Sequence, residues 1–82
     1  MKAPAVRAVA TAHDLPEIAA AIEAIAERGE EPAIAVDGDD LGEKLTHLLL
    51  AQRIRTRVAA GEDLKDAFRA EMAAVRGTLA ND

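Results

Sequence analysis

The sequence predicts one small α+β domain, residues 1–82, rich in helix and in the order β-α-β-α-α. Two short runs that contain β-branched residues flank a capped amphipathic helix, which predicts a βαβ unit. Two further helical patterns follow, and the short link between them predicts an antiparallel C-terminal helical pair. A chain of 82 residues has the size of a single domain.

The two expected strands are residues 5–11 and residues 33–36. Val6 and Val9 favour a strand in the first run, because β-branched side chains fit a pleated sheet well. The second run is brief and apolar, and it lies between Pro32 and an Asp-Gly turn signal. A two-stranded sheet is marginally stable and leaves open edges, so we expect pairing with a second copy.

Residues 15–28 carry the first helical pattern, with signals at both ends. Asp14 and Glu17 have the spacing of a capping box, and Gly29 suits the position after the last turn. The apolar stripe along this helix consists of Leu15, Ile18, Ile22 and Ile25. The segment is therefore expected to be an amphipathic helix that begins after Asp14.

Residues 41–60 are expected to form a long helix, with Asp40 and Glu43 as a second capping box and Gly61 at its end. Its apolar side chains lie on both sides of the helix: Leu41, Leu45, Leu48, Leu49, Leu50, Ile54 and Val58. A helix that is apolar over most of its circumference must be covered on two sides. These side chains are therefore the predicted interface with a protein partner or a second copy.

Residues 64–79 are expected to form the last helix, which Asp63 caps. Its apolar stripe consists of Leu64, Phe68, Met72, Val75 and Leu79. The link of residues 61–63 is short, so this helix should pack antiparallel to the helix before it.

The composition predicts a thin core. Twenty residues are alanine and Phe68 is the one aromatic residue, so little apolar area is available for burial. Small chains gain stability from disulfides, a metal or a partner subunit, and the absence of cysteine removes disulfides and thiolate metal sites. We therefore expect a homo-oligomer in the reducing cytoplasm. The N-terminal residues lack a signal-peptide pattern, and residues 48–50 are far too short a leucine run to cross a bilayer, so no membrane contact is expected.

The residue types argue against an enzyme. Serine, cysteine, tyrosine and tryptophan are all absent, so a nucleophile would have to be a threonine, a lysine or a carboxylate. The absence of serine also excludes a phosphopantetheine carrier. No Gly-rich phosphate loop or dinucleotide fingerprint is present, so no cofactor is expected.

The acidic turn at residues 37–43 has some features of a calcium-binding EF-hand loop. Asp37 and Asp39 match its first ligands, but Leu41 and Leu48 stand where two further ligands are needed. We interpret the segment as a polar turn that caps the following helix, and we expect no metal.

The two histidines, His13 and His47, have no fixed metal-ligand spacing. We interpret His13 as a solvated turn residue and His47 as a half-buried residue at a helix contact. A pH-sensitive interface is the alternative, because histidine titrates near neutrality.

The net charge of −5 is unevenly distributed: residues 30–43 carry six acids and no base, and residues 44–60 carry four bases and no acid. Arg53 and Arg57 lie one turn apart on the same helix face. They either pair with acids of the chain itself or contact an anion or an acidic protein partner, since arginine forms bidentate pairs.

Nucleic-acid binding is disfavoured. An acidic chain is poorly suited to the phosphate backbone, which needs several bases on one face. Residues 50–76 have a tolerable spacing for a helix-turn-helix motif. However, Asp63 and Asp66 would lie at the N-terminal end of the recognition helix, facing DNA.

Residues 5–36 resemble antitoxins of the Phd/YefM type in the order of their elements. The shared features are a short strand, an Asp-led helix and the sequence Arg28-Gly29-Glu30-Glu31-Pro32 before an apolar strand. The resemblance implies a DNA-binding regulator, with Lys2, Arg7 and the arginines of residues 53–57 on phosphates, and a toxin-neutralising C-terminal helix. Such antitoxins continue with a basic turn and a third strand, whereas residues 37–40 here lead directly into a helix.

The sequence therefore predicts a small, non-enzymatic accessory or regulatory protein that acts by protein–protein binding as a homodimer. The alternative is an antitoxin-like DNA-binding transcriptional regulator.

Overall fold

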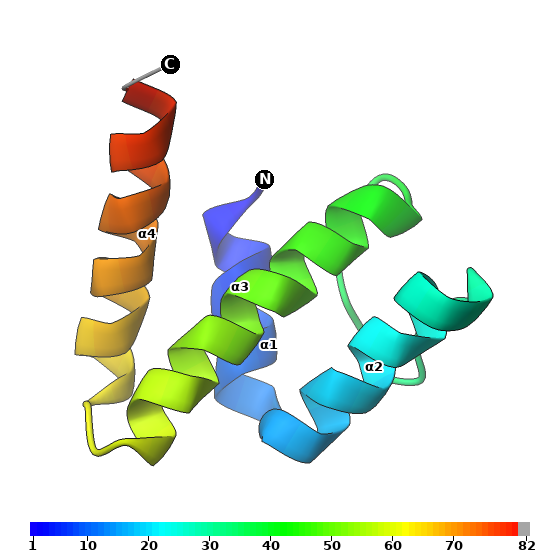
Figure 1. The fold of residues 1–82 in the computed structure, drawn as a ribbon, viewed down its shortest axis with the longest axis horizontal. Helices are drawn as coiled ribbons and strands as arrows, with labels where there is room; N and C mark the ends of the chain where they lie inside the picture. Colours follow the sequence, from blue (N-terminus) through cyan, green and yellow to red (C-terminus); the bar gives the residue numbers. More distant parts are fainter. Residues whose placement is uncertain (81–82) are drawn as a thin grey trace.

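Helices alone form the regular structure of residues 1–80. The computed structural model describes the backbone of residues 1–80 and the side chains of residues 1–77. Its helices are α1 (Ala3–Ala12), α2 (Leu15–Arg28), α3 (Leu41–Ala59) and α4 (Leu64–Ala80) (Figure 1). The described part of the chain contains no strand, so the predicted α+β class with its β-α-β-α-α order is wrong. Leu79, which the sequence places on the last apolar stripe, lies outside the described side chains.

The first predicted strand, residues 5–11, lies inside α1. Five of the ten residues of α1 are alanine, the strongest helix former, and Pro4 lies in the first turn, where its missing N–H costs nothing. Val6 and Val9 are three residues apart, and they are buried together with alanines of the same helix face. Helical burial of this face outweighs the modest strand preference of two valines.

The second predicted strand, residues 33–36, is part of an irregular connector of residues 29–40 between α2 and α3. Burial alternates along it as in a strand, because Ile34 and Val36 pack partly buried against the core while the two alanines are exposed. Its expected partner strand is helical, so it has no strand with which to pair. Alternation of this kind therefore marks an extended segment on the core, and not a sheet.

The predicted first residues of α2, α3 and α4 and the predicted last residue of α2 are confirmed, whereas α3 ends at Ala59, one residue before its predicted end. Asp14 and Glu17 form the capping box of α2, and Gly29 ends that helix in the left-handed conformation, with φ 63°. The Asp40 carboxylate caps α3 by accepting a hydrogen bond from the backbone N–H of Glu43 at 2.8 Å. The second capping box is incomplete, because the Glu43 carboxylate accepts from the backbone N–H of Asp39 at 2.7 Å instead of that of Asp40.

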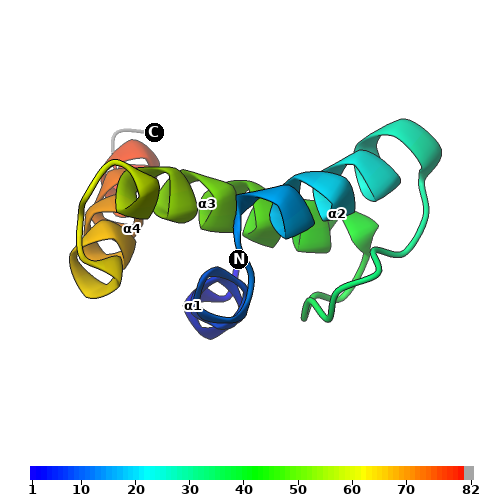
Figure 2. The same ribbon diagram turned by 90° about the horizontal axis from the view of Figure 1, so that it is seen from below.

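Helix α3 lies at the centre of the fold and packs against the other three helices. In Figure 1 it crosses in front of α1, with α4 on one side and α2 on the other; Figure 2 shows α1 on one face of the layer that α2, α3 and α4 form. The largest fully buried side chains are Val6, Val9, Ile18, His47, Leu48 and Ile54. None of the helices in residues 1–80 is both long and apolar enough to cross a bilayer.

His47 attaches the N-terminus and the connector to α3. It is fully buried, deeper than the half-buried position that the sequence predicts. Its Nε2 accepts a hydrogen bond from the backbone N–H of Lys2 at 3.0 Å, and its Nδ1 contacts the carbonyl oxygen of Asp37 at 2.6 Å. An N–H can only donate and a carbonyl can only accept, so this arrangement requires a neutral ring with its proton on Nδ1. His47 therefore has a structural role that both ring nitrogens serve.

Candidate functional site

The apolar residues predicted as an interface on α3 differ widely in exposure. Leu48 and Ile54 are 0% exposed, whereas Leu49 is 43% exposed. The remaining members pack partly buried against the core: Leu41, Leu45, Leu50 and Val58. Helices α1, α2 and α4 thus supply, within one chain, most of the cover that α3 needs. A partner contact through the exposed part of this set stays a prediction.

Arg53 and Arg57, the predicted anion contacts, both bind Glu71 of α4. The Nε of Arg53 donates to Oε1 of Glu71 and the Nε of Arg57 donates to Oε2, each at 2.6 Å. We call these three residues the Glu71 clamp. The internal-pairing interpretation of the two arginines is therefore confirmed, and a contact with an outside anion stays a prediction.

The clamp keeps a buried carboxylate ionised. Glu71 is 2% exposed, and an unpaired carboxylate would be costly at that position. Burial is the largest single influence and raises the pKa of Glu71. The hydrogen bonds from Arg57 and Arg53 together more than offset it, and they hold the pKa below its ordinary value.

The acidic turn and the surface histidine form local contacts. Among the described residues, no group of three or more His, Cys, Asp or Glu is placed to hold a metal ion. Asp39 pairs with the Lys2 ammonium at 3.3 Å. The His13 Nδ1 lies 3.0 Å from a carboxylate oxygen of Glu17, and this hydrogen bond is the main cause of a lowered Glu17 pKa.

The threonine hydroxyls are engaged within their own helices. Thr11, Thr46 and Thr56 each donate a hydrogen bond to the carbonyl oxygen four residues earlier, at 2.7, 3.1 and 2.8 Å. Thr78 lies outside the described side chains. The three described hydroxyls therefore cap backbone carbonyls, and none of them is bonded to a histidine or a carboxylate that could activate it.

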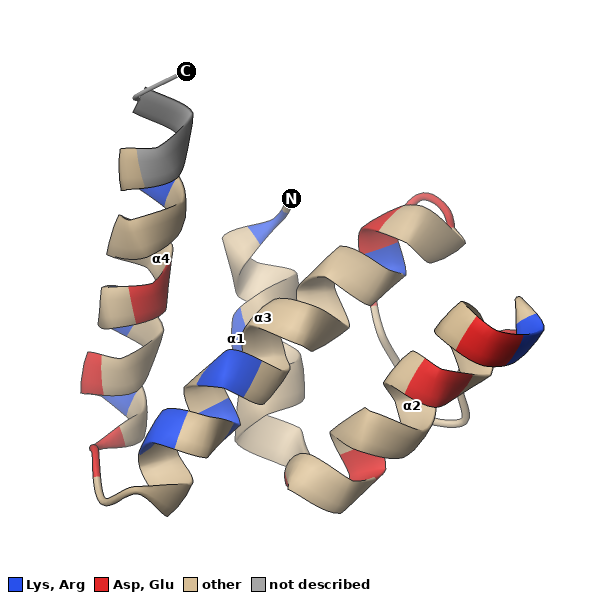
Figure 3. Ribbon diagram, in the orientation of Figure 1, with Lys and Arg blue, Asp and Glu red and all other residues tan. Residues whose placement is uncertain are grey.

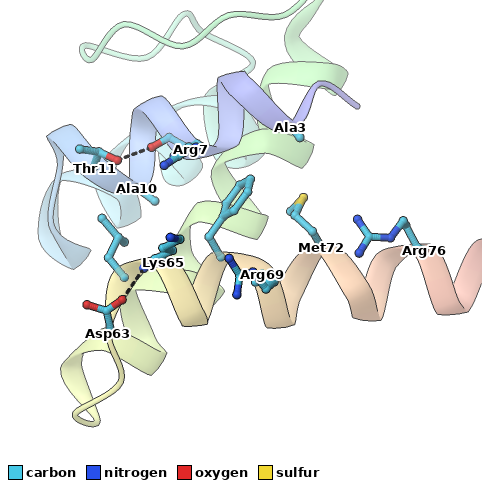
Figure 4. Close-up of a pocket in the computed structure, with 11 residues that line it drawn as sticks. Ala3, Arg7, Ala10, Thr11, Asp63, Lys65, Arg69, Met72 and Arg76 are labelled. Atoms are coloured by element: carbon cyan, nitrogen blue, oxygen red, sulfur yellow. Dashed lines mark hydrogen bonds between the residues drawn. The ribbon is translucent and has the colours of Figure 1, made fainter.

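A groove of about 600 Å³ lies between α1 and α4, and Figure 4 shows the side chains that line it. Its floor is apolar and is formed by Ala3, Ala10, Leu64, Phe68 and Met72. Its polar lining comes from Arg7, Thr11, Asp63, Lys65, Arg69 and Arg76. We call this feature the α1–α4 groove.

The cations of the α1–α4 groove lack carboxylate partners. No Asp or Glu among the described residues forms an ion pair with Arg7, Lys65, Arg69 or Arg76. Lys65, Arg69 and Arg76 are spaced i, i+4 and i+11, which places them on one face of α4, and all three are exposed. We call these three residues the α4 stripe. The Arg7 guanidinium lies over the Phe68 ring, 5.7 Å from its centroid.

The charges of the protein separate along the molecule. Residues 14–43 contain ten acids and one base, whereas residues 44–77 contain seven bases and four acids. Figure 3 shows the acids concentrated on α2 and the start of α3, and bases on the second half of α3. The α1–α4 groove is therefore a locally basic surface on a protein of net charge −5.

A second hollow, of about 750 Å³, lies over the Glu71 clamp and includes Leu15 and Gln52 in its lining. Its two arginines are already neutralised by Glu71. The α1–α4 groove is the stronger candidate, because its positive charge is not consumed within the described chain.

Sequence reasoning missed the α4 stripe. The available signal was the i, i+4, i+11 spacing of three bases along one helix face. In the linear sequence the basic spacing is obscured by three acids, Asp63, Asp66 and Glu71. In the folded chain Glu71 lies on a different face of α4 and contacts Arg53 of α3. The groove itself also depends on residues 3–12 being a helix, which the sequence did not predict.

The chain belongs to the family described as "Family of unknown function (DUF6952)", whose model matches residues 1–80. No curated protein and no solved structure matches it. The family thus assigns no activity, and a functional proposal has to come from the geometry of the chain itself.

Proposed function

We propose that this protein is a non-catalytic, cytoplasmic accessory or regulatory protein that acts by binding another protein in the α1–α4 groove. One observation carries the proposal: an apolar floor is edged by four cations that form no ion pair with a carboxylate of the described residues. An apolar centre with a charged rim is the usual composition of a protein-binding surface.

The engagement of the polar side chains supports binding over catalysis. The described threonine hydroxyls bond to helix carbonyls, and both nitrogens of His47 are held by backbone groups. His13 and Glu17 are close to one another but have no hydroxyl or thiol partner among the contacts of the described residues. A catalytic group needs a free lone pair or proton at the reacting atom.

The antitoxin alternative has lost its main support. Its resemblance begins with a strand at residues 5–11 and ends with one at residues 33–36, and these segments are a helix and an irregular connector. The expectation of a homodimer also needs a new reason, because α1, α2 and α4 already cover most of α3. Self-association stays a prediction that light scattering over a range of concentrations tests.

Site-specific photo-crosslinking in the source cell tests the proposed function. A benzophenone amino acid replaces Thr11, an exposed residue that lines the groove, and in a control it replaces Glu23, an exposed residue of α2. We expect a discrete protein adduct at Thr11 that Arg69→Glu abolishes and Arg28→Glu leaves in place. The same adducts at both positions, or none at Thr11, would contradict the proposal.

A further inference from the structure

Building on the function proposed above, we propose that the occupant of the α1–α4 groove is an acidic amphipathic helix of the partner protein. Its apolar side chains would rest on the floor of the groove, and its carboxylates would meet the α4 stripe. This is the helix-in-groove mode of peptide recognition with a charged edge.

The three cations of the α4 stripe are arranged along the axis of α4, over a distance that a short ligand helix can match. Lys65 and Arg76 are eleven residues apart, which corresponds to about 16 Å along the helix axis at 1.5 Å per residue. Arg69 lies between them on the same face, and Met72, which is 5% exposed, lies beneath this edge as part of the core. A ligand helix of about three turns would therefore place carboxylates opposite all three cations at matched spacing.

The floor suits the close approach of a helix. On its α1 side Ala3 and Ala10 are small side chains that allow two helix axes to come near each other, on either side of Arg7, which also lines the groove. Its α4 side offers Phe68, which is only partly buried by the chain itself. A leucine or phenylalanine of the ligand can cover this ring, and that burial would supply an anchor for binding.

A protein helix fits this groove better than a nucleic acid does. Asp63 lines the groove and Asp66 lies in the first turn of α4, so a continuous phosphate chain would meet two carboxylates there. The ten acids of residues 14–43 add a long-range repulsion that grows with the charge of the ligand, and a duplex carries far more negative charge than a short helix with three carboxylates. A phosphate backbone would also leave the apolar floor unused, whereas an amphipathic helix covers it.

Designed peptides test the inference. Two fluorescein-labelled helical peptides of about 14 residues carry three glutamates on one face and leucines on the adjacent face. In the first peptide the glutamates are spaced i, i+4 and i+11, which matches a ligand helix in one direction along α4. In the second they are spaced i, i+7 and i+11, which matches the opposite direction. A third peptide of the same composition distributes the glutamates around the helix. Fluorescence anisotropy measures binding to the full chain, and a duplex oligonucleotide serves as the competing ligand class.

We expect one of the two matched peptides to bind at least about tenfold more tightly than the distributed peptide, a difference typical of one lost anchor contact. Binding should weaken as salt rises from about 0.01 M to about 1 M, because the Debye length shortens from about 30 Å to about 3 Å. Arg69→Glu should abolish binding. Arg28→Glu, an equal charge change on α2, should alter it less than about twofold, since rim charges distant from the site act weakly.

Exchanging the charges of the peptide and the protein distinguishes a lost contact from a misfolded variant, because a misfolded variant would not bind the exchanged peptide either. A peptide in which lysine replaces the glutamate opposite Arg69 should bind the Arg69→Glu variant and bind the wild-type chain poorly. Equal binding of matched and distributed peptides, or tighter binding of the oligonucleotide, would overturn the acidic-helix occupant.

The two proposals can fail separately. A Thr11 adduct with a partner, combined with no binding of either matched peptide, keeps the proposed function and rejects the acidic helix. Binding of a matched peptide without any adduct in the cell keeps the chemistry of the groove and rejects the proposed function.

Discussion

Two basic clusters lie on neighbouring helices, and the fold treats them in opposite ways. On α3, Arg53 and Arg57 both bind the buried carboxylate of Glu71. On α4, the stripe of Lys65, Arg69 and Arg76 faces solvent beside the groove and has no carboxylate partner in the described chain. The density of arginine along the sequence is therefore a poor guide to the surface that is available for a ligand.

The difference follows from where the nearest acid lies. Glu71 is on the side of α4 that packs against α3, where removal from water makes two hydrogen-bonded cations necessary. The α4 stripe stays hydrated, so its cations cost little when they are unpaired, and a pairing there would add little to stability. The Glu71 clamp should thus serve stability, and the α4 stripe should serve binding.

The largest effect should come from Glu71→Gln, which removes the charge from the clamp while it keeps the size of the side chain. One of the two arginine hydrogen bonds is lost, because the amide NH2 group cannot accept, and the other loses its charged acceptor, so we expect a loss of about 1.5–3 kcal/mol in the free energy of unfolding. Arg69→Gln is the matched control on the same helix and should change it by less than about 0.5 kcal/mol. Urea unfolding with an unchanged m-value measures both, and equal losses would remove the distinction between the two clusters.

The pH dependence of stability should show the same contrast. The pKa of Glu71 in the folded chain is held below its ordinary value of 4.5. As the pH falls, Glu71 of the unfolded chain is therefore protonated at a higher pH than Glu71 of the folded chain. The clamp therefore contributes fully above pH 4.5, and its contribution is lost as the pH falls through the lower, folded-state pKa.

Urea unfolding at a series of pH values below neutrality should give a shallower acid decline for Glu71→Gln than for the wild-type chain. A residual slope should remain, because the pKa of Glu17 is also lowered, chiefly by its hydrogen bond to His13. Arg69→Gln should leave the wild-type slope unchanged. Identical slopes for the wild-type chain and Glu71→Gln would refute the clamp as the source.

The two arginines of the clamp should differ in their contributions. Arg57 also pairs with Glu62 at 3.3 Å and is 37% exposed, whereas Arg53 is 66% exposed. We expect Arg57→Gln to lower the free energy of unfolding more than Arg53→Gln does, since hydration weakens the more exposed pair. Thermal or urea unfolding of the single variants ranks them, and the reverse order would contradict this assignment.

The smallest effect should come from Arg7 at the edge of the groove. Its contact with the Phe68 ring should contribute about 0.5 kcal/mol, the lower range for exposed cation–π pairs. A double-mutant cycle with Arg7→Gln and Phe68→Leu isolates this coupling. Fully additive single losses would show that Arg7 is free for a ligand even in the unbound protein.

Helix ends were predictable because their signals act within one turn. The Asp14 and Asp40 carboxylates each accept a hydrogen bond from the backbone N–H three residues later, and Gly29 supplies the conformation that ends α2. Such contacts form whatever the rest of the chain does.

By itself, the sequence determined where α2 begins and ends, where α3 and α4 begin, and that most nucleophile types are missing. Only the tertiary structure decided that residues 3–12 are a helix, because packing on α3 outweighs the near balance between alanine and valine preferences. It also decided which basic cluster is neutralised, since Glu71 reaches Arg53 and Arg57 only after α4 folds back onto α3. Local hydrogen bonds are set by neighbours in the chain, whereas charge pairing and burial are set by the surfaces that meet.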